Sequence, residues 1–146
     1  MFQQLIECFR TNAAGAWATV EAFEPLLSKS GGTPRIINVS TGGGSIGMTL
    51  DPESPFRALK EPQYRVSKAA MNMVSACQTV EYTERGWKVL CYNPGFTESN
   101  LGPMNKVEMG AKPVGGPAGM IVKMVDGEMD GDVGKFLHHE FPDISW

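Results

Sequence analysis

The sequence predicts an α/β fold in which short parallel strands alternate with helices. Long segments with apolar residues at helical spacing alternate with short runs of β-branched and aromatic residues. The order is helix, strand, helix, strand, helix, strand, and no internal repeat interrupts it. This alternation is typical of parallel strands joined by right-handed helical crossovers.

The first helix is expected from Met1 to about Leu27. Its apolar residues recur every three or four positions, and Gly15 marks the place where the helix would bend if it is not straight. A turn of Ser, Gly, Gly, Thr and Pro at 30–34 then ends the helix. We therefore expect one long helix, or one helix with a bend, before the first strand.

The central part of the chain predicts a strand, a loop and a second helix. Residues 35–40 are β-branched and apolar, as in a strand buried on both faces of a sheet, and residues 41 to about 62 are rich in Gly and Pro. Residues 63–84 contain neither Gly nor Pro, and Gly86 suits the left-handed position that ends a helix. The expected buried stripe of this helix consists of Val66, Ala70, Met73, Val74 and Cys77.

The C-terminal third continues the alternation with shorter elements. Residues 87–92 predict a strand that stops at Asn-Pro-Gly, 93–95. Residues 117–125 predict a short helix, and residues 135–138 predict a last strand. The chain therefore ends as the third unit of the same pattern.

Composition and charge limit the class of protein. A chain of 146 residues with 42% hydrophobic residues has room for one core and one domain. The net charge of -3 and the lack of a Lys/Arg cluster argue against a nucleic acid as partner. Cys8, Cys77 and Cys91 lie outside C-x-x-C spacing, which predicts neither disulfides nor a thiolate metal site and favours the cytoplasm. No signal peptide or membrane-spanning run is expected, and therefore no membrane as partner.

Tyr64 and Lys68 lie one helical turn apart in the second expected helix. This spacing places an ammonium beside a phenol, and a nearby positive charge lowers the pKa of Tyr, which starts near 10. Such a Tyr suits general acid or base chemistry at neutral pH. With three Tyr and eight Lys, about one sixth of such a pair is expected by chance, so the spacing alone is a weak signal.

Ser40 and Thr41 stand where the first expected strand ends. Ligands of open α/β sheets bind outside the carboxyl ends of the strands, and a hydroxyl there can stabilise a carbonyl oxygen as negative charge develops on it. The alternative is that these hydroxyls satisfy backbone groups of the following loop, which is the commoner role of a single Ser or Thr. Both interpretations are open at the level of sequence.

Three further motifs are interpreted as structural. Residues 42–47 match G-x-G-x-x-G, but no helix that could receive a pyrophosphate is expected directly after them, so a flexible loop is expected. Residues 126–131 open like a calcium-binding loop whose twelfth position would be Leu137, so a solvated acidic turn is expected. His138 and His139 are adjacent and would point to opposite faces of a strand. No metal site is therefore expected.

In this order, four segments resemble the short-chain dehydrogenase/reductase family over nearly the whole chain. They are Thr-Asn with Gly15 in the first helix (11–15), Ile-Ile-Asn-Val-Ser-Thr (36–41), Tyr-Arg-Val-Ser-Lys-Ala-Ala (64–70) and Asn-Pro-Gly-Phe-Thr (93–97). The resemblance implies a partial Rossmann-type, doubly wound parallel sheet whose strands would be the contiguous fifth, sixth and seventh of the family. About ten additional residues between Thr41 and Tyr64 resemble the carbonyl-reductase-like branch, in which helix-mediated dimerisation is hindered.

The resemblance implies a catalytic set of Asn12, Thr41, Tyr64 and Lys68. Tyr64 would donate a proton to a carbonyl that is being reduced, or accept one in the reverse oxidation. Lys68 would lower the pKa of Tyr64 and hold the nicotinamide ribose, and Asn12 would support a water-linked proton relay to Lys68. The family has Ser where this chain has Thr41, so Ser40 is the second choice for the hydroxyl.

The resemblance also implies a cofactor-binding set, to which Tyr64 and Lys68 belong. The segment after the second strand would pass the nicotinamide of NAD or NADP and contact its carboxamide or the adjacent phosphate. The residues of this segment are Pro94, Gly95, Phe96, Thr97 and Ser99. The preference between NAD and NADP is not determined.

The family pattern begins with a strand, a Gly-rich turn and a helix that bind the adenosine diphosphate half of the cofactor, and this chain has no counterpart. We therefore expect one truncated domain over 1–146, with an unpaired sheet edge that favours self-association. One function is NAD(P)-dependent interconversion of a small-molecule carbonyl and alcohol once the missing half is supplied. The other is a non-catalytic remnant that binds protein through this edge. An apolar substrate pocket would be lined by Met48, Phe56, Phe96, Leu101 and Met104.

Overall fold

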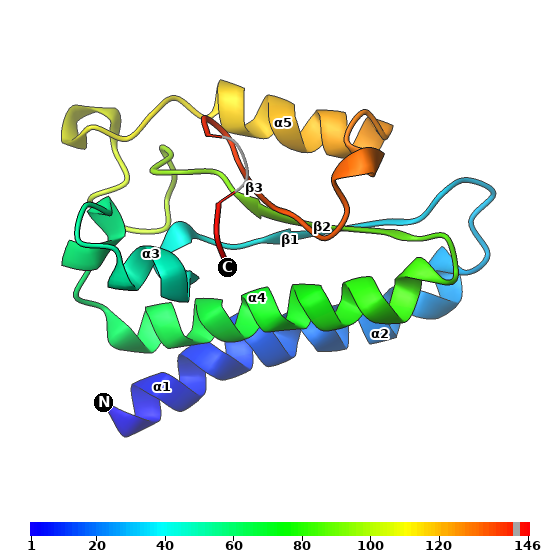
Figure 1. Ribbon diagram of the computed structural model, residues 1–146, viewed down its shortest axis with the longest axis horizontal. Helices are drawn as coiled ribbons and strands as arrows, with labels where there is room; N and C mark the ends of the chain where they lie inside the picture. The colour runs from blue at the N-terminus through cyan, green and yellow to red at the C-terminus, as the bar shows by residue number, and fades with distance from the viewer. Residues whose placement is uncertain (142–143) are drawn as a thin grey trace.

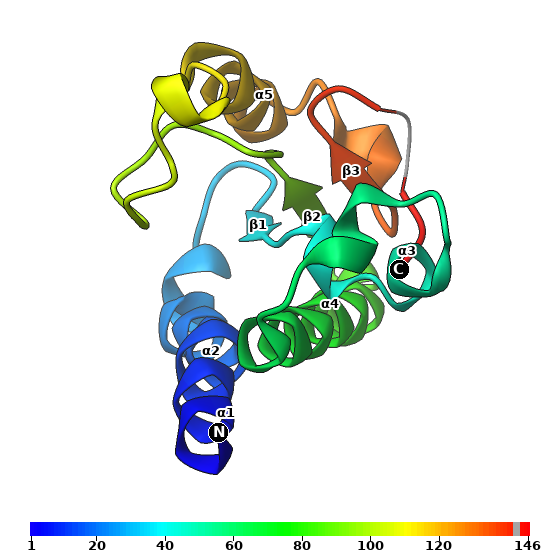
Figure 2. The same ribbon diagram turned by 90° about the vertical axis from the view of Figure 1, so that its left-hand side faces the viewer.

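The protein, described here from a computed structural model at residues 1–141 and 144–146, is built in three layers. The middle layer is a sheet of β1 (Arg35–Val39), β2 (Lys88–Asn93) and β3 (Phe136–His138). Figure 1 shows the N-terminal helices and α4 (Pro62–Thr83) on one face of the sheet and α5 (Gly115–Asp126) on the other. Figure 2 shows the same layers end on.

The sheet is parallel, and its strands follow chain order, β1-β2-β3. Val39 lies opposite Tyr92, and Asn93 lies opposite His138, so the three strands end at one edge of the sheet. Each strand begins and ends within one residue of the predicted range. The predicted α/β fold and its contiguous parallel strands are confirmed.

The first helix is one rod that changes its winding in the middle. α1 (Phe2–Phe9) continues through a π-helical turn (Arg10–Ala14) into α2 (Gly15–Leu27), and Figure 1 shows no break between them. The irregular turn lies directly before Gly15, where the sequence indicates a bend. Single π-helical turns inside α-helices are frequent at functional sites.

Helix α4 begins and ends with the residues that the sequence favours for these positions. Pro62 lies in the first turn, where the missing N–H costs no hydrogen bond. Gly86 has φ +76°, its N–H donates to the Thr83 carbonyl, and the N–H of Trp87 donates to the Tyr82 carbonyl. This pair of bonds is the Schellman arrangement, so the predicted role of Gly86 is confirmed.

The predicted apolar stripe of α4 is wrong. Val66 is 55% exposed and Met73 is 64% exposed, Cys77 is exposed, and Ala70 and Val74 are half-buried, so none of the five residues is in the core. The buried face instead consists of Ser67, Met71, Asn72, Ser75, Gln78 and Tyr82. Polar residues are buried here because the strands supply polar partners; for example, Asn38 Nδ2 donates to Gln78 Oε1 over 2.8 Å.

Two apolar clusters pack the faces of the sheet. On the helix α2 and α4 side, the buried cluster consists of Val20, Ile36, Tyr82, Trp87 and Val89. On the α5 side, it consists of Leu90, Tyr92, Met124 and Leu137. Successive residues of β2 therefore alternate between the clusters, as expected of a strand covered on both faces.

The segment after β1 is more ordered than predicted. Residues 42–44 and 55–58 form 3₁₀ turns, and α3 (Ile46–Leu50) lies between them. The buried Ser45 starts α3, because its Oγ accepts a hydrogen bond from the N–H of Met48 over 3.0 Å. The expectation of a loop over 41–62 is therefore wrong for these turns.

The acidic turn after α5 is also not merely solvated. Asp130 receives two hydrogen bonds of 2.8 Å from the guanidinium of Arg35, which anchors the turn to the start of β1. These two parallel hydrogen bonds are the bidentate geometry in which a guanidinium and a carboxylate match each other. His138 is the last residue of β3 and His139 lies beyond it; the ring of His138 is against Phe141, and that of His139 is near Gly116.

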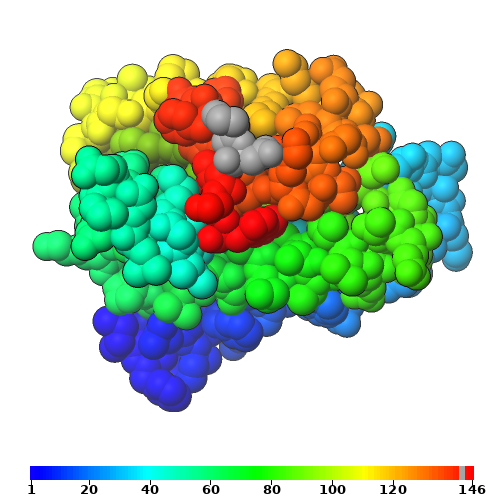
Figure 3. All heavy atoms as spheres, in the orientation of Figure 1, coloured from blue at the N-terminus to red at the C-terminus, as the bar shows by residue number. Residues whose placement is uncertain are grey.

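The C-terminal residues fold back over the sheet edge. The N–H of Ile144 donates to the Phe136 carbonyl over 2.9 Å, and the N–H of Gly47 donates to the Trp146 carbonyl over 3.3 Å. The Trp146 ring stacks on Phe136 with centroids 5.3 Å apart. Figure 3 shows these residues in red between α3 and the C-terminal strand region.

At the other edge, β1 has a neighbour only on the β2 side. A groove of about 380 Å³ lies beside it, lined mainly by apolar residues of α2 and β1, which include Val20, Phe23 and Ile37. The predicted unpaired edge is therefore present in the described chain. Within the same residues, no helix is both long and apolar enough to cross a membrane.

Candidate active site

Tyr64 lies in the first turn of α4 and Lys68 in the second, and Lys68 connects this helix to the sheet. The Nζ of Lys68 donates a 2.9 Å hydrogen bond to the carbonyl of Val39, the last residue of β1. The same nitrogen lies 6.0 Å from the centroid of the Tyr64 ring. The pair therefore stands at the carboxyl edge of the sheet, where open α/β folds bind their ligands.

The ionisation of this pair differs from the prediction. Burial raises the pKa of Tyr64, and the negative charge of Glu61 raises it further. Burial also lowers the pKa of Lys68. The predicted lowering of the Tyr64 pKa is therefore wrong for the protein without a ligand, because the ammonium is bound to the Val39 carbonyl and burial disfavours both charges.

Asn12 joins the first helix to the turn of α4 that carries Tyr64. It lies in the π-helical turn, and its Nδ2 donates to Ser67 Oγ over 2.9 Å. Ser67 Oγ in turn donates to the Tyr64 carbonyl over 2.7 Å. The structure thus places Asn12 beside the pair, while its role in a proton relay stays a prediction.

The two candidate hydroxyls have different surroundings. Ser40 is buried, and its Oγ donates to Asn72 Oδ1 over 2.5 Å. Thr41 is half-buried, and its Oγ1 accepts a hydrogen bond of 3.2 Å from the N–H of Gly43. Thr41 is therefore the hydroxyl with access to a ligand, although it also serves the backbone role that the sequence left open.

The glycines that follow Thr41 have a packing role. A Cβ on Gly42 would lie 2.5 Å from the Phe56 ring, and one on Gly43 would lie 2.9 Å from Leu59. A Cβ on Gly44 would lie 2.7 Å from the backbone of Lys68. The G-x-G-x-x-G match thus brings this segment close to α4 and its neighbours, and α3 after it has only five residues.

The segment after β2 lies at the same edge of the sheet. Gly95 has φ +73°, and its N–H donates to Asn93 Oδ1 over 2.9 Å. The hydroxyl of Thr97 donates to the Pro94 carbonyl over 2.8 Å. Phe96 is 48% exposed, so this turn presents both apolar and polar groups outward.

The structure brings the predicted site residues into two groups. The first group contains Asn12, Tyr64, Lys68 and Thr41. Asn12 is linked through Ser67 to the Tyr64 carbonyl, and Lys68 binds the Val39 carbonyl, two residues before Thr41. The second is the turn 94–99 at the end of the neighbouring strand. Within residues 1–141 and 144–146, no hydrogen bond joins Ser99 or Phe96 to Tyr64 or Lys68.

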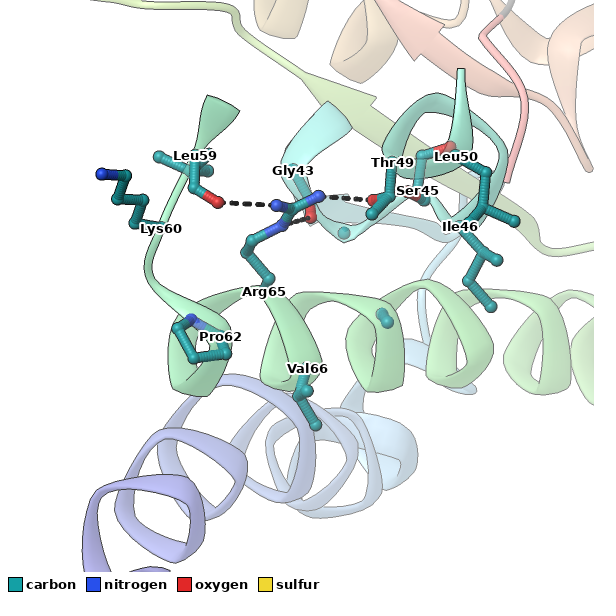
Figure 4. Close-up of a pocket in the computed structure, with 12 residues that line it drawn as sticks. Gly43, Ser45, Ile46, Thr49, Leu50, Leu59, Lys60, Pro62, Arg65 and Val66 are labelled. Carbon is teal, nitrogen blue, oxygen red and sulfur yellow. Dashed lines mark hydrogen bonds between the residues drawn. The ribbon is translucent and has the colours of Figure 1, made fainter. Parts of the chain in front are cut away.

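The predicted apolar substrate pocket is not formed as expected. Phe56 packs against Gly42, and Leu101 and Met104 are 79% and 56% exposed. The hollow that does exist, of about 510 Å³, lies between α3, residues 59–62 and α4 (Figure 4). Gly43 and Gly44 contribute to its lining, and none of the five predicted pocket residues does.

Arg65, which the sequence did not indicate, organises this hollow. Its guanidinium donates to the carbonyls of Gly43 and Leu59 over 3.0 and 2.7 Å, and to Thr49 Oγ1 over 2.5 Å (Figure 4). Arg65 therefore fixes the segment before α4 against the helix, next to Tyr64. Its only sequence signal is a charged residue within the motif that carries Tyr64 and Lys68.

No group of three or more His, Cys, Asp or Glu side chains gathers in a metal-binding arrangement within residues 1–141 and 144–146. Cys91 is buried, and burial raises the pKa of its thiol to about 11, so it stays protonated at neutral pH.

Acidification is expected to destabilise the protein through His138. Burial lowers the pKa of His138 below its ordinary value of 6.5, so the unfolded chain binds a proton more readily than the folded one. Stability should be full above about pH 6.5 and should fall as the pH drops toward the folded pKa. Urea unfolding at several pH values, with His138→Asn against His139→Asn, measures this effect.

His138→Asn retains an acceptor for the N–H of Glu140, which now binds His138 Nδ1 over 2.9 Å. We expect this variant to flatten the acid side of the stability profile, and the His139 variant to leave it unchanged. An unchanged profile in His138→Asn would assign the acid sensitivity to other groups.

Comparison with known proteins adds to this geometry. No protein-family model matches the chain. The short-chain dehydrogenase anuI of Penicillium roqueforti is 36% identical over 132 residues, which are 82% of this chain and 52% of that protein. The short-chain dehydrogenase srdF of Neurospora crassa is 34% identical over 93% of this chain and 53% of its own length. The chain thus spans about half the length of these curated relatives.

Solved structures show the same partial match. The NADPH-bound carbonyl reductase from chicken fatty liver superposes with a TM-score of 0.83 and 27% identity, over all of this chain and 58% of that one. The carbonyl reductase Sniffer of Drosophila melanogaster has a TM-score of 0.77 and 21% identity over the same shares, which shows likeness of fold.

Proposed function

Because the chain is homologous over most of its length to the short-chain dehydrogenases/reductases, we propose that it carries the proton-transfer part of an NAD(P)-dependent oxidoreductase that interconverts a carbonyl and an alcohol. The observation that carries this proposal is the position of Tyr64 and Lys68 at the carboxyl edge of the sheet, with Lys68 bound to the end of β1. Tyr64, Lys68, Thr41 and Asn12 are the residues that we assign to this site, as the resemblance implies. A small-molecule carbonyl or alcohol is the proposed substrate.

Tyr64 acts as the proton donor in the direction of reduction. Its raised pKa keeps the phenol protonated at neutral pH, so the O–H can donate to a carbonyl oxygen on which negative charge develops. In the reverse oxidation, the same group must first lose its proton, which the raised pKa opposes until positive charge is brought near.

Lys68 binds the cofactor ribose and Thr41 binds the substrate oxygen in this proposal. An ammonium has three donors, and one of them is used on the Val39 carbonyl, so two are available for ribose hydroxyls. The Thr41 hydroxyl, at the adjacent end of β1, donates to the substrate oxygen in this proposal. Asn12 holds the turn of α4 that positions Tyr64, through Ser67.

The residues present fit one half of a nicotinamide cofactor. Lys68 offers free donors, and Gly95 has a left-handed backbone without a side chain, which lets a flat ring approach the turn. Pro94, Phe96, Thr97 and Ser99 complete the proposed nicotinamide side. For the adenosine diphosphate half, the Gly42–Gly44 turn leaves no room, because the Phe56 and Leu59 side chains and the backbone of α4 lie against it. When bound, the cofactor supplies or accepts the hydride.

Titration of NADPH and NADH into the purified 146-residue chain, followed by nicotinamide fluorescence, tests the proposal. Saturable binding that Lys68→Met abolishes is the expected result for a nicotinamide site on this chain. Lys123→Met, on the exposed face of α5, is the matched control and should bind normally. Absence of binding up to millimolar nucleotide would show that this chain does not act by itself.

The association state decides between the two sequence-based hypotheses in the same samples. Self-association through the free edge of β1 stays a proposal, supported by the missing neighbour of β1 and the apolar groove beside it. Light scattering across a concentration series measures it. A monomer that binds nucleotide would contradict the alternative of a non-catalytic, protein-binding remnant.

A further inference from the structure

We propose that Asn72 is a positioning residue for this site, whose side chain fixes the end of β1 from which Lys68 and Thr41 are held. That Lys68 and Thr41 bind cofactor and substrate rests on the function proposed above. The positioning itself is a property of the chain without any ligand, so it can be measured even if the proposed function fails.

Asn72 lies one helical turn after Lys68 on the buried side of α4. It is 5% exposed, and its Oδ1 accepts a 2.5 Å hydrogen bond from Ser40 Oγ. The thiol of Cys91, on β2, lies 3.9 Å from the same oxygen. Asn72 therefore joins α4 to the carboxyl ends of two neighbouring strands.

Ser40 is the residue through which this bond acts on the site. Its N–H donates to the Tyr92 carbonyl over 2.7 Å, so its backbone is fixed to β2 while its side chain is fixed to α4. The residue before it, Val39, supplies the carbonyl that binds Lys68, and the residue after it is Thr41. Ser40, fixed at both its backbone and its side chain, thus lies between the Val39 carbonyl that binds Lys68 and the Thr41 hydroxyl.

A packing role alone does not account for Asn72. Within residues 1–141 and 144–146, its buried Nδ2 has no hydrogen-bond partner, and such an orphaned group destabilises a fold. An apolar side chain of the same volume would fill the space without that cost. The amide supplies what an apolar side chain cannot, which is a directional acceptor that sets Ser40 and the strand end against the helix.

Competitive acetylation of lysines tests this proposal. The chain is treated briefly with a limiting acetylating reagent, and mass spectrometry gives the labelling of Lys68 relative to the seven other lysines. Asn72→Leu and the milder Ser40→Ala remove the clamp from either side. Each should raise the relative labelling of Lys68 by about three- to tenfold, because the ammonium then leaves the Val39 carbonyl more often.

Two further variants separate positioning from loss of stability. Gln78→Leu removes the neighbouring bond to Asn38, in the same buried layer but farther along α4, and should leave the labelling ratio of Lys68 unchanged. Asn72→Asp keeps the acceptor oxygen for Ser40 and should restore labelling to the original level or below it.

Equal increases in Asn72→Leu and Gln78→Leu would overturn the proposal, as would an unchanged ratio in Ser40→Ala. Because Ser40→Ala removes only one oxygen, it answers the question even if Asn72→Leu does not fold. Nucleotide titration of the same variants reports separately on the proposed function: absent binding with the expected labelling would leave the positioning role of Asn72 intact.

Discussion

Replacing Tyr64 by Phe is expected to lower carbonyl reduction by at least about 100-fold, the size of effect typical of losing a positioned general acid. The substitution removes only the phenol oxygen. The ring stays half-buried beside Lys68, and the hydrogen bond from Ser67 Oγ goes to the Tyr64 backbone carbonyl, which remains. The fold should therefore be unchanged while the proton donor is lost.

Loss of nicotinamide absorbance with an aromatic ketone or aldehyde as substrate measures this turnover. If the chain binds no nucleotide alone, the same variant is tested after fusion to the nucleotide-binding half of a relative. Tyr82→Phe is the matched control, since Tyr82 lies in the same helix, buried against Trp87. It should keep normal turnover, and substantial turnover in Tyr64→Phe would remove Tyr64 from its proposed role.

Replacing Gly44 by Ala is expected to cost about 1–3 kcal/mol of stability and to disturb the site as well. The added Cβ would lie 2.7 Å from the Lys68 carbonyl carbon and 2.9 Å from the Ala69 nitrogen. These are backbone atoms of α4, so no rotamer change can relieve the contact. Either α4 or the end of β1 must move, and both carry groups of the site.

Chemical unfolding in urea measures the loss of stability, and the acetylation of Lys68 reports the movement of the helix. Gly119→Ala is the matched control, because Gly119 is exposed in α5 and a Cβ there meets no atom within 4 Å. This variant should be neutral or slightly more stable, since Ala favours a helix over Gly. Equal stability of the two variants would contradict the packing role assigned to Gly44.

The order of the elements, and most of their limits, could be predicted because they depend on local sequence. Short, largely apolar runs form the three strands, and Pro62 and Gly86 bound α4 through the backbone conformations that they favour. The spacing of Tyr64 and Lys68 places them one turn apart in any helix. These features need no knowledge of what packs against the chain.

The tertiary structure alone decided which face of α4 is buried and how the site is charged. The apolar spacing of Val66 and Met73 predicted burial, yet that side is exposed, because Asn38 and Ser40 from β1 provide hydrogen-bond partners for the polar side instead. The effect of Lys68 on Tyr64 likewise depended on the Val39 carbonyl, which binds the ammonium. Burial and partners come from residues far apart in the chain, so periodicity and spacing cannot supply them.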